Sequence, residues 1–369
     1  MDINVDFLIS GCNTQCKHCY VNGGPGPQMG IEDALTCIEK LDATAQFLPP
    51  GSEFTLDHEP MNYPCLGRIL NAAARTRHIR NYHHGMTTGI GLMGRRDKDA
   101  VIQAYFENGY TEFGITIHGA GAHHDEIVLR PGAYEKTIAA AEYFKGKGAG
   151  IGVSLMLNRF FVQDAAALNA MLSKLEPDHI WFVIPIFTPH QNMEAFEPYR
   201  ADMEVLRSLA RYLPQWNAPN ILQKAERHTV GAVIAGLKSG MRLREKFQSP
   251  QHELYLTLHP DCKLYVGNTG VETELLCDLR FAEPEALAGR INALPANRDY
   301  TAFYDLDALP AENDLIAAME SLPQGNVYGD VESVLYRGLV ELNTPTRILK
   351  GLWPAASRRM QEAVSARRE

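Results

Sequence analysis

The sequence predicts an α/β protein, a partial TIM-like (β/α)6 barrel with a smaller α+β cap at its C-terminal end. Two observations lead to this fold class. Over the first 190 residues, short apolar or alternating segments are followed by segments of helical spacing, six times in succession. Such a succession implies parallel strands joined by crossover helices. After about residue 190 the pattern stops, and charged, helical sequence follows.

Each element is predicted from its own periodicity. We expect strands at 4–10, 54–57, a segment ending near Thr87, 113–117, 150–158 and 180–187, and helices at 31–45, 65–76, 98–108, 133–146 and 164–175. In the fourth strand, apolar residues alternate with small or polar ones, which places the two sets on opposite faces. We therefore expect Thr116 and His118 to point into the barrel, as do Ser154 and Asn158 from the fifth strand. Functional loops of such barrels lie at the carboxyl ends of the strands.

The expected division of the chain is a barrel core at 1–190, a helical segment at 191–250 and a cap at 251–369. The cap begins with a β-hairpin over 253–266 that turns at His259-Pro260-Asp261. Its end is expected to be a solvated helix, with a binding arm as the alternative, and contains Arg358, Arg359, Arg367 and Arg368.

The composition excludes several classes of protein. The chain has 369 residues, 45% hydrophobic and 21% charged, which is typical of a globular protein. Its net charge of −9 argues against binding to nucleic acid or to anionic membranes. The N-terminus lacks a secretory signal, and no apolar run approaches the roughly 20 residues that cross a bilayer. We expect a cytoplasmic protein.

The seven cysteines indicate a metal or cluster site rather than a disulfide framework. Their number is odd, and three of them lie within eight residues (Cys12, Cys16, Cys19, Cys37, Cys65, Cys262 and Cys277). The first three have Cys-x3-Cys-x2-Cys spacing and follow the first strand. Three thiolates can bind three irons of a [4Fe–4S] cube and leave the fourth iron open. The alternatives are a zinc site with His18 as fourth ligand, and a disulfide with one thiol left over.

This segment, completed by Tyr20, resembles the signature of the radical S-adenosylmethionine (SAM) superfamily. The resemblance implies that Cys12, Cys16 and Cys19 hold a [4Fe–4S] cluster whose open iron binds SAM. It also implies reductive cleavage of SAM to a 5′-deoxyadenosyl radical, which removes hydrogen from a substrate. A flavodoxin- or ferredoxin-type protein would supply the electron.

Further segments resemble motifs of the same superfamily, in the same order along residues 5–190. Asp57-His58-Glu59-Pro60 is similar to Gly-Gly-Glu-Pro, whose glutamate contacts the SAM amino group, but the two glycines are replaced. Thr87-Thr88-Gly89 is similar to a Thr-Asn-Gly segment that lines the SAM site. The resemblance implies SAM-binding roles for Glu59, Thr87, Thr116, Arg130, Ser154 and Asn158, with the Arg130 guanidinium on the SAM carboxylate.

Other polar residues at strand ends are expected to border the substrate. Thr116-Ile117-His118-Gly119 is similar to a Ser-x-Asp-Gly segment of the peptide- and sulfatase-maturing relatives. His118 departs from the aspartate and could contact substrate or carry a proton, or it could be a hydrogen-bonded core histidine. We assign the substrate space to Asp57, His58, His118 and Tyr20.

The C-terminal hairpin resembles the start of the SPASM or twitch domains of these relatives. Such domains bind further clusters, which need three or four thiolates. Only Cys262 and Cys277 lie there, so we expect a degenerate, twitch-like cap, with a two-cysteine site completed by histidines as the alternative. Cys37 and Cys65 are expected to be structural.

Three functions remain at this point. The first is a radical SAM enzyme acting on a small natural-product or amino-acid-like substrate. It is favoured because the chain begins at the first strand, without a preceding peptide-recognition domain. The second is a maturase of ribosomally made peptides, because the motifs are most similar to those of peptide and protein modifiers. The third is a non-catalytic Fe–S redox sensor.

Overall fold

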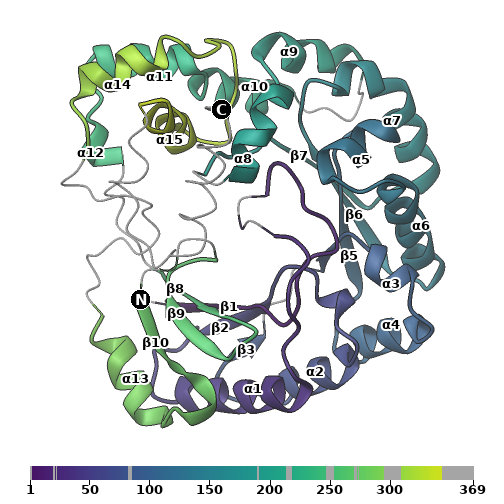
Figure 1. Cartoon of the computed structure of the whole chain (residues 1–369). Coiled ribbons are helices and arrows are strands. Elements are labelled where there is room, and N and C mark those ends of the chain that lie inside the picture. The colour runs from purple at the N-terminus through teal and green to yellow at the C-terminus, as the bar shows by residue number, and fades with distance from the viewer. Residues whose placement is uncertain are drawn as a thin grey trace, which may run out of the picture.

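Seven parallel strand segments form the N-terminal half of the molecule (Figure 1). The computed structural model describes residues 2–19, 21, 23–81, 85–188, 191–212, 218–246, 253–269, 272, 274–294 and 309–342. The strands of this half are β1 (Asp2–Phe7), β2 (Glu53–Leu56), β3 (Arg80–Asn81), β4 (Met86–Thr87), β5 (Glu112–Ile117), β6 (Gly150–Met156) and β7 (His179–Val183). Every pairing among them is parallel.

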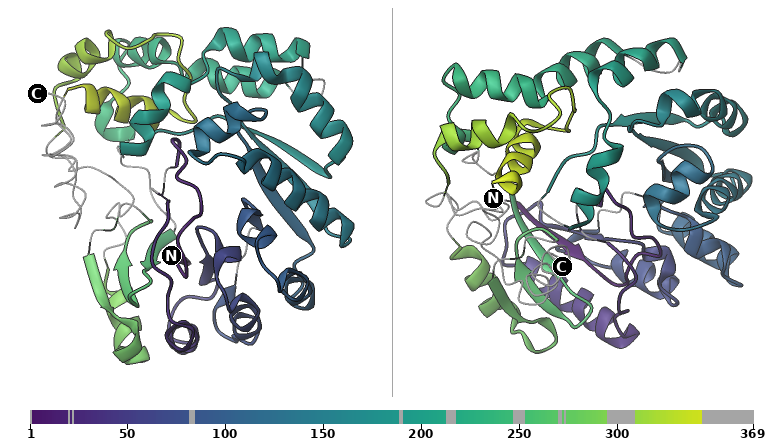
Figure 2. Two further views of the ribbon diagram at one scale, coloured as in Figure 1. Left: turned by 45° about the vertical axis from the view of Figure 1, so that its right-hand side comes forward. Right: turned by 45° about the horizontal axis from the view of Figure 1, so that its top comes forward.

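The strands lie in two sheets that do not close into a complete barrel. One sheet has the order β10-β9-β8-β1-β2-β3, and the other has the order β4-β5-β6-β7. Helices cover the outer side of the strands, as the two views of Figure 2 show. The predicted α/β class and partial barrel are confirmed.

The crossover helices follow the strands in the expected order. They are α1 (Ile31–Ala45), α2 (Leu66–Ala73), α3 (Ile90–Met93), α4 (Lys98–Glu107), α5 (Ala122–Val128), α6 (Ala133–Gly146) and α7 (Phe161–Leu175). The prediction of a sixth strand reaching residue 187 was wrong beyond Val183. Two residues further, Pro185 has no N–H to donate to a sheet, so the strand stops before it.

Alternation along the strands separates the helix-covered side from the barrel interior. Phe113, Ile115 and Ile117 of β5 are fully buried in the main core. Thr116 pairs in register with Ser154 of β6, on the opposite face. The side chains of Thr116 and Ser154 therefore face the interior of the barrel, as predicted.

The C-terminal half consists of helices and a hairpin. Its elements are α8 (Gln191–Phe196), α9 (Met203–Tyr212), α10 (Ala218–Arg227), α11 (Val230–Lys238), α12 (Leu243–Lys246), β8 (Glu253–Leu258), β9 (Lys263–Val266), β10 (Glu274–Asp278), α13 (Pro284–Asn292), α14 (Glu312–Met319) and α15 (Val331–Glu341). Helices α11, α14 and α15 contribute to a second hydrophobic core that includes Phe187 and Tyr328. The arginine-rich terminal segment lies outside the described residues.

The hairpin is part of the barrel sheet. β8 and β9 are antiparallel and turn where predicted. β8 also pairs in parallel with the whole of β1, from Asp2 opposite Glu253 to Phe7 opposite Leu258. The three-part division of the chain remains a prediction. Among the described residues, no helix is both long and apolar enough to cross a membrane.

Candidate active site at the carboxyl ends of the strands

The cysteine loop, residues 8–19, leaves the carboxyl end of β1 and packs against a helix end. Backbone N–H groups of Gln15 and Lys17 donate to the carbonyl oxygens of Val128 and Ile127, the last turn of α5. These carbonyls have no partner within their own helix, so the loop satisfies them. A Cβ atom at Gly11 would lie 2.3 Å from the amide nitrogen of Gly26, so only glycine fits at the start of the loop.

The three thiols of this loop have hydrogen-bond partners within the loop or just after it, and two of them share one partner. The sulfurs of Cys12 and Cys16 lie 3.2 and 3.4 Å from the Thr14 hydroxyl. The Cys19 sulfur accepts a 3.0 Å hydrogen bond from the Gly23 N–H. Burial raises the pKa of Cys12 to about 11 and that of Cys16 to about 12, and it also raises the pKa of Cys19. Without metal these groups are thiols, and metal binding would release their protons.

The other cysteines do not join this set. Cys37 and Cys262 are buried, and their thiols hydrogen-bond to each other. Cys65 precedes α2, and Cys277 lies in β10 opposite Leu264. The loop thus offers three sulfur ligands, which fits a cluster with one iron that the protein leaves open.

Glu59 connects the ends of two strands. It is 1% exposed. One carboxylate oxygen accepts from the Thr87 hydroxyl at 2.6 Å, and the other accepts from the N–H and hydroxyl of Thr88 at 2.6 and 2.7 Å. Burial raises the pKa of Glu59, and the threonine hydrogen bonds partly offset this shift. The two motifs predicted for the SAM site are therefore in direct contact.

Residues around Asn13 connect this pair of motifs to the cysteine loop. The Thr88 hydroxyl oxygen also lies 3.1 Å from the Asn13 side-chain oxygen, and the Asn13 amide donates to Asn62 at 3.0 Å. The Arg130 guanidinium donates to the backbone oxygen of Asn13. Arg130 thus lies beside the loop, where its predicted SAM contact remains a prediction. Thr88 belongs to a predicted segment in which only Thr87 was given a role, and Asn13, inside the cysteine motif, was missed as a site residue.

His118 is in contact with the cysteine loop. It is 3% exposed, its Nε2 atom contacts Nε2 of His18, and its Nδ1 atom is buried without a hydrogen-bond partner. Burial lowers the pKa values of His18 and His124 to about 4 and also lowers that of His118, so all three rings are neutral. Among the residues with described positions, one trio of metal-ligating side chains has ligand atoms within 4.8 Å of one another: Cys16, His18 and His118.

The predicted residues on β6 differ in their surroundings. Ser154 is buried and adjacent to half-buried Thr116 on the inner face. Asn158 is fully buried, and its amide donates to the backbone oxygens of His118 and Met156 at 2.6 and 3.0 Å. Its side-chain oxygen accepts from the Phe160 N–H at 2.9 Å. Asn158 thereby connects the ends of β5 and β6, and a SAM contact from it remains a prediction.

The predicted substrate residues Asp57 and His58 follow β2. Asp57 accepts from the His58 N–H at 2.7 Å. His58 has a φ of 65°, in the left-handed region that favours glycine, and its Nε2 atom is buried without a partner. The motif that this segment resembles has glycine here, a residue that adopts such a φ without strain. Tyr20, the remaining predicted residue, lies outside the described residues.

Three further titratable residues near Asp57 and His58 were missed. Asp6 of β1 accepts from the Thr269 hydroxyl at 3.1 Å, and His259 lies 2.9 Å from the Glu272 carboxylate. Burial, together with the charges of Asp57 and Glu272, raises the pKa of Asp6 to about 7. The alternation in β1 alone could have identified Asp6 as inward-facing, but not its neighbours, which come from the C-terminal half.

The sequence profile of the radical SAM superfamily matches residues 7–164. The pre-heme d1 synthase of Dinoroseobacter shibae (strain DSM 16493 / NCIMB 14021 / DFL 12) is 29% identical over 147 residues, which are 40% of this chain and 34% of that protein. The chain therefore matches about a third of that relative's length.

Two solved structures are similar over most of the chain. Native anSMEcpe with bound AdoMet and Cp18Cys peptide has a TM-score of 0.52 at 11% identity, covering 94% of this chain and 99% of that one. Streptococcus suis SuiB bound to S-adenosylmethionine has a TM-score of 0.50 at 10% identity, covering 89% of this chain and 76% of that one. At such identities the similarity concerns the fold, and it agrees with the partial barrel.

Proposed function

We propose that the chain is a radical SAM enzyme, as the profile match over residues 7–164 indicates, and that it activates a C–H bond of a small natural-product or amino-acid-like substrate. It is an enzyme whose cofactors are a [4Fe–4S] cluster and SAM. When bound, these cofactors supply a 5′-deoxyadenosyl radical that removes hydrogen from the substrate. The protein's own residues must hold them, orient the substrate and limit the access of water.

We assign the cluster to Cys12, Cys16 and Cys19. The observation that supports this assignment is the gathering of three thiols on one loop at the carboxyl end of β1, with the chain's other described thiols elsewhere. Glu59 is held between the loop and the end of β4, with its carboxylate oriented by Thr87 and Thr88. That orientation suits an ammonium group such as that of SAM.

The remaining SAM contacts are assigned to Thr87, Thr116, Ser154 and Asn158, in or just after the strands β4, β5 and β6, and to Arg130, which lies between α5 and α6 and contacts the cysteine loop. His118, Asp57 and His58 are assigned to the substrate. Asp6 is a third polar group in the neighbourhood of Asp57 and His58. Among the described residues, neither Asp6 nor Asp57 forms an ion pair with lysine or arginine. A substrate with an amino group, such as an amino-acid-like molecule, is complementary to these carboxyl groups.

The function is tested by reconstituting the protein with iron and sulfide without oxygen, reducing it with dithionite and adding SAM. We expect about four irons per chain and formation of 5′-deoxyadenosine, measured by mass spectrometry. A protein that binds no iron, or holds a cluster but never consumes SAM, would contradict the proposal. A flavodoxin- or ferredoxin-type protein should replace dithionite as electron donor.

A ribosomally made peptide is the second candidate substrate. It is favoured by the fold shared with anSMEcpe and SuiB, whose structures include a Cp18Cys peptide and the precursor peptide SuiA. Deuterium transfer from labelled substrate into 5′-deoxyadenosine distinguishes the two candidates. Transfer from peptides but from no amino-acid-like molecule would favour the maturase.

A further inference from the structure

A lysine within the cysteine loop is held by residues from two distant parts of the chain. The Lys17 ammonium donates to the Tyr199 hydroxyl at 2.5 Å and lies 4.0 Å from the centre of the Tyr199 ring. The same hydroxyl donates to the Glu126 carboxylate of α5, which lies 3.9 Å from the Lys17 ammonium. The Lys17 side chain is 12% exposed and the Glu126 side chain is 46% exposed, so the lysine end of this contact is shielded from water while the carboxylate end is not.

The position of Lys17 makes this contact relevant to the cluster site. Lys17 follows Cys16 directly, and one residue, His18, separates it from Cys19. Its backbone N–H donates to Ile127 at 2.9 Å, so both the main chain and the side chain of Lys17 are bound on the α5 side of the loop. The next residue, His18, turns the other way and contacts His118 and Phe196, with ring centres 4.5 and 5.9 Å apart.

Phe196 and Tyr199 belong to one short segment, residues 196–200, which follows β7 and α8. The Tyr199 backbone oxygen accepts from the Arg159 N–H at 2.9 Å, and the Arg159 guanidinium lies 5.1 Å from the Tyr199 ring. The segment therefore contacts the cysteine loop at two consecutive residues, Lys17 and His18.

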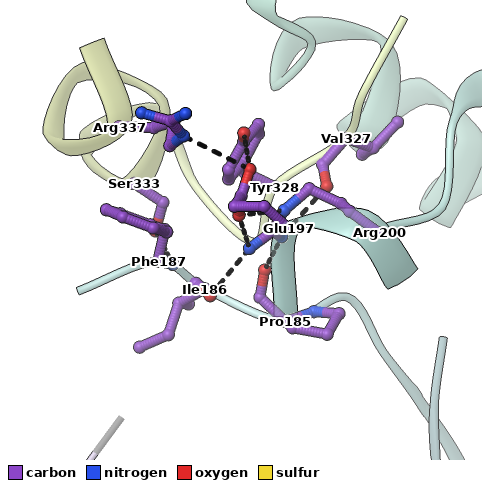
Figure 3. Close-up of polar contacts among 9 residues, drawn as sticks. All are labelled: Pro185, Ile186, Phe187, Glu197, Arg200, Val327, Tyr328, Ser333 and Arg337. Atoms are coloured by element: carbon purple, nitrogen blue, oxygen red, sulfur yellow. Dashed lines mark hydrogen bonds and ion pairs between the residues drawn. The ribbon is translucent and has the colours of Figure 1, made fainter. Parts of the chain in front are cut away.

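Arg200 fixes the far end of the segment to the C-terminal half (Figure 3). Its side chain is fully buried and pairs with Glu197 at 2.9 Å. It also donates to the backbone oxygens of Pro185 and Val327 at 2.8 and 3.3 Å, and its guanidinium lies 3.9 Å from the centre of the Tyr328 ring.

Glu197 completes this junction. Its second oxygen accepts from the Tyr328 hydroxyl at 2.7 Å and lies 3.6 Å from the Arg337 guanidinium of α15. Nearby, the Ser333 hydroxyl accepts from the Phe187 N–H at 2.8 Å. The buried Arg200–Glu197 pair is thus held by hydrogen bonds from several elements, which restrict its geometry, whereas the Nε atom of Arg337 is buried without a hydrogen-bond partner.

We propose that Tyr199 is a positioning residue for the cluster loop, and that the Arg200–Glu197–Tyr328 junction holds Tyr199 in place. Tyr199 keeps Lys17 on the α5 side of the loop, so that His18 and the flanking cysteines face the site. The C-terminal half thereby sets the conformation of the loop between Cys16 and Cys19. This inference rests on the proposed cluster ligation by the loop.

The first test uses cluster-free protein and therefore does not depend on the proposed chemistry. Tyr199→Phe removes the hydroxyl between Lys17 and Glu126, and pulsed alkylation with mass spectrometry measures the reactivity of each thiol. We expect Cys16 and Cys19 to react about fivefold faster, the factor that corresponds to loss of one hydrogen bond from a locally opening segment. The half-buried Cys277 of β10 should be unaffected and serves as internal control.

The matched variant is Tyr143→Phe, which also removes a hydroxyl that donates to a carboxylate, here Asp99 on an outer helix. It should leave the reactivity of all thiols unchanged. Equal thiol reactivity in Tyr199→Phe and Tyr143→Phe would overturn the proposal. So would a general rise that includes Cys277, because that pattern indicates global destabilisation.

The second test uses the reconstituted enzyme. We expect Tyr199→Phe to lose iron to a chelator several-fold faster at an unchanged melting temperature, and to alter the SAM-dependent change in the electron paramagnetic resonance spectrum. Lys17→Met should have the same effect, and the double variant should add little, because both changes remove one interaction. Additive effects would contradict a shared role.

The junction is tested with Tyr328→Phe, which removes only the hydrogen bond to Glu197. If the junction positions Tyr199, this change should raise the alkylation rate of Cys16 and Cys19 in the same direction as Tyr199→Phe, although it lies in the other half of the chain. If the alkylation rates of Cys16 and Cys19 are unchanged in Tyr328→Phe, the junction does not position Tyr199, and that part of the proposal is overturned. If wild-type protein binds no cluster but the alkylation results hold, the proposed function fails and the positioning role stands.

Discussion

Single side chains at this site have environments that determine their chemistry. Glu59 combines almost complete burial with three hydrogen bonds to its carboxylate. Asp6 is partly buried, has one threonine partner and has an adjacent carboxylate. The ionised form of Glu59 is therefore stabilised by more hydrogen bonds than that of Asp6. We expect the two carboxyl groups to respond differently to mutation and to pH.

The cluster cysteines are the first residues to test. Cys16→Ser should remove most of the iron and abolish formation of 5′-deoxyadenosine, because a hydroxyl binds iron far more weakly than a thiolate. The matched control is Cys65→Ser, which replaces a half-buried thiol at the start of α2. This variant should retain both its iron and the formation of 5′-deoxyadenosine. Iron analysis and mass spectrometry provide the measurements. Full iron content in Cys16→Ser would contradict the assigned ligands.

Asp6 predicts a pH-dependent stability. Its pKa is about 7 in the folded chain against 3.8 as the ordinary value, so the folded state retains a proton that the unfolded state releases between these values. The wild-type protein should therefore lose stability as pH rises from about 4 to 7, by at most about 4 kcal/mol.

Asp6→Asn removes this titration. The melting temperature of the variant relative to wild type should rise with pH up to about 7 and then level off, as measured by thermal unfolding in a series of buffers. Asp2→Asn, an exposed position on the same strand, is the control. A difference between Asp6→Asn and wild type that is constant from pH 4.5 to 8 would disagree with the raised pKa.

At the scale of elements, helix ends position the site. The last carbonyls of α5 accept from the cysteine loop, while Asp125 within the same helix accepts from the N–H groups of Gly132 and Tyr134 at the start of α6. Leu129, between the two helices, has a φ of 54°, a left-handed conformation that ends α5. Arg130 is thereby directed to the loop.

Asp125→Ala should destabilise the fold by about 1–2 kcal/mol, the usual contribution of a side chain that caps a helix start. Urea unfolding measures this loss. Asp314→Ala in the first turn of α14, an exposed acidic position, is the control and should cost less than about 0.5 kcal/mol. Equal losses in the two variants would show that Asp125 does not act as a cap.

At the scale of the whole molecule, the two halves of the chain form one sheet. β8 pairs with all six residues of β1, and its Leu254, Leu256 and Leu258 are buried in the main core. The C-terminal half also supplies Thr269 and His259 near the substrate residues, and the junction around Arg200. Figure 1 shows the hairpin next to β1.

A chain cut after residue 246 should therefore not fold into a stable barrel, because β1 would lose one of its two partners and expose an edge. We expect aggregation on size-exclusion chromatography, and recovery of soluble complex when residues 247–369 are expressed alongside. A monodisperse, cooperatively unfolding 1–246 fragment would show that the N-terminal half is an independent domain.

The sequence by itself determined the partial barrel, the cysteine loop, and most strands and longer helices of the N-terminal half to within a few residues. It predicted neither α3 nor α5. The predicted features depend on local periodicity and spacing, which a short window of sequence contains. The tertiary structure alone decided the parallel pairing of β8 with β1, the contacts of Thr88, Asn13 and Asp6, and the bond between Lys17 and Tyr199. Those contacts join residues dozens to hundreds of positions apart, and no local pattern encodes which distant partner a polar side chain will meet.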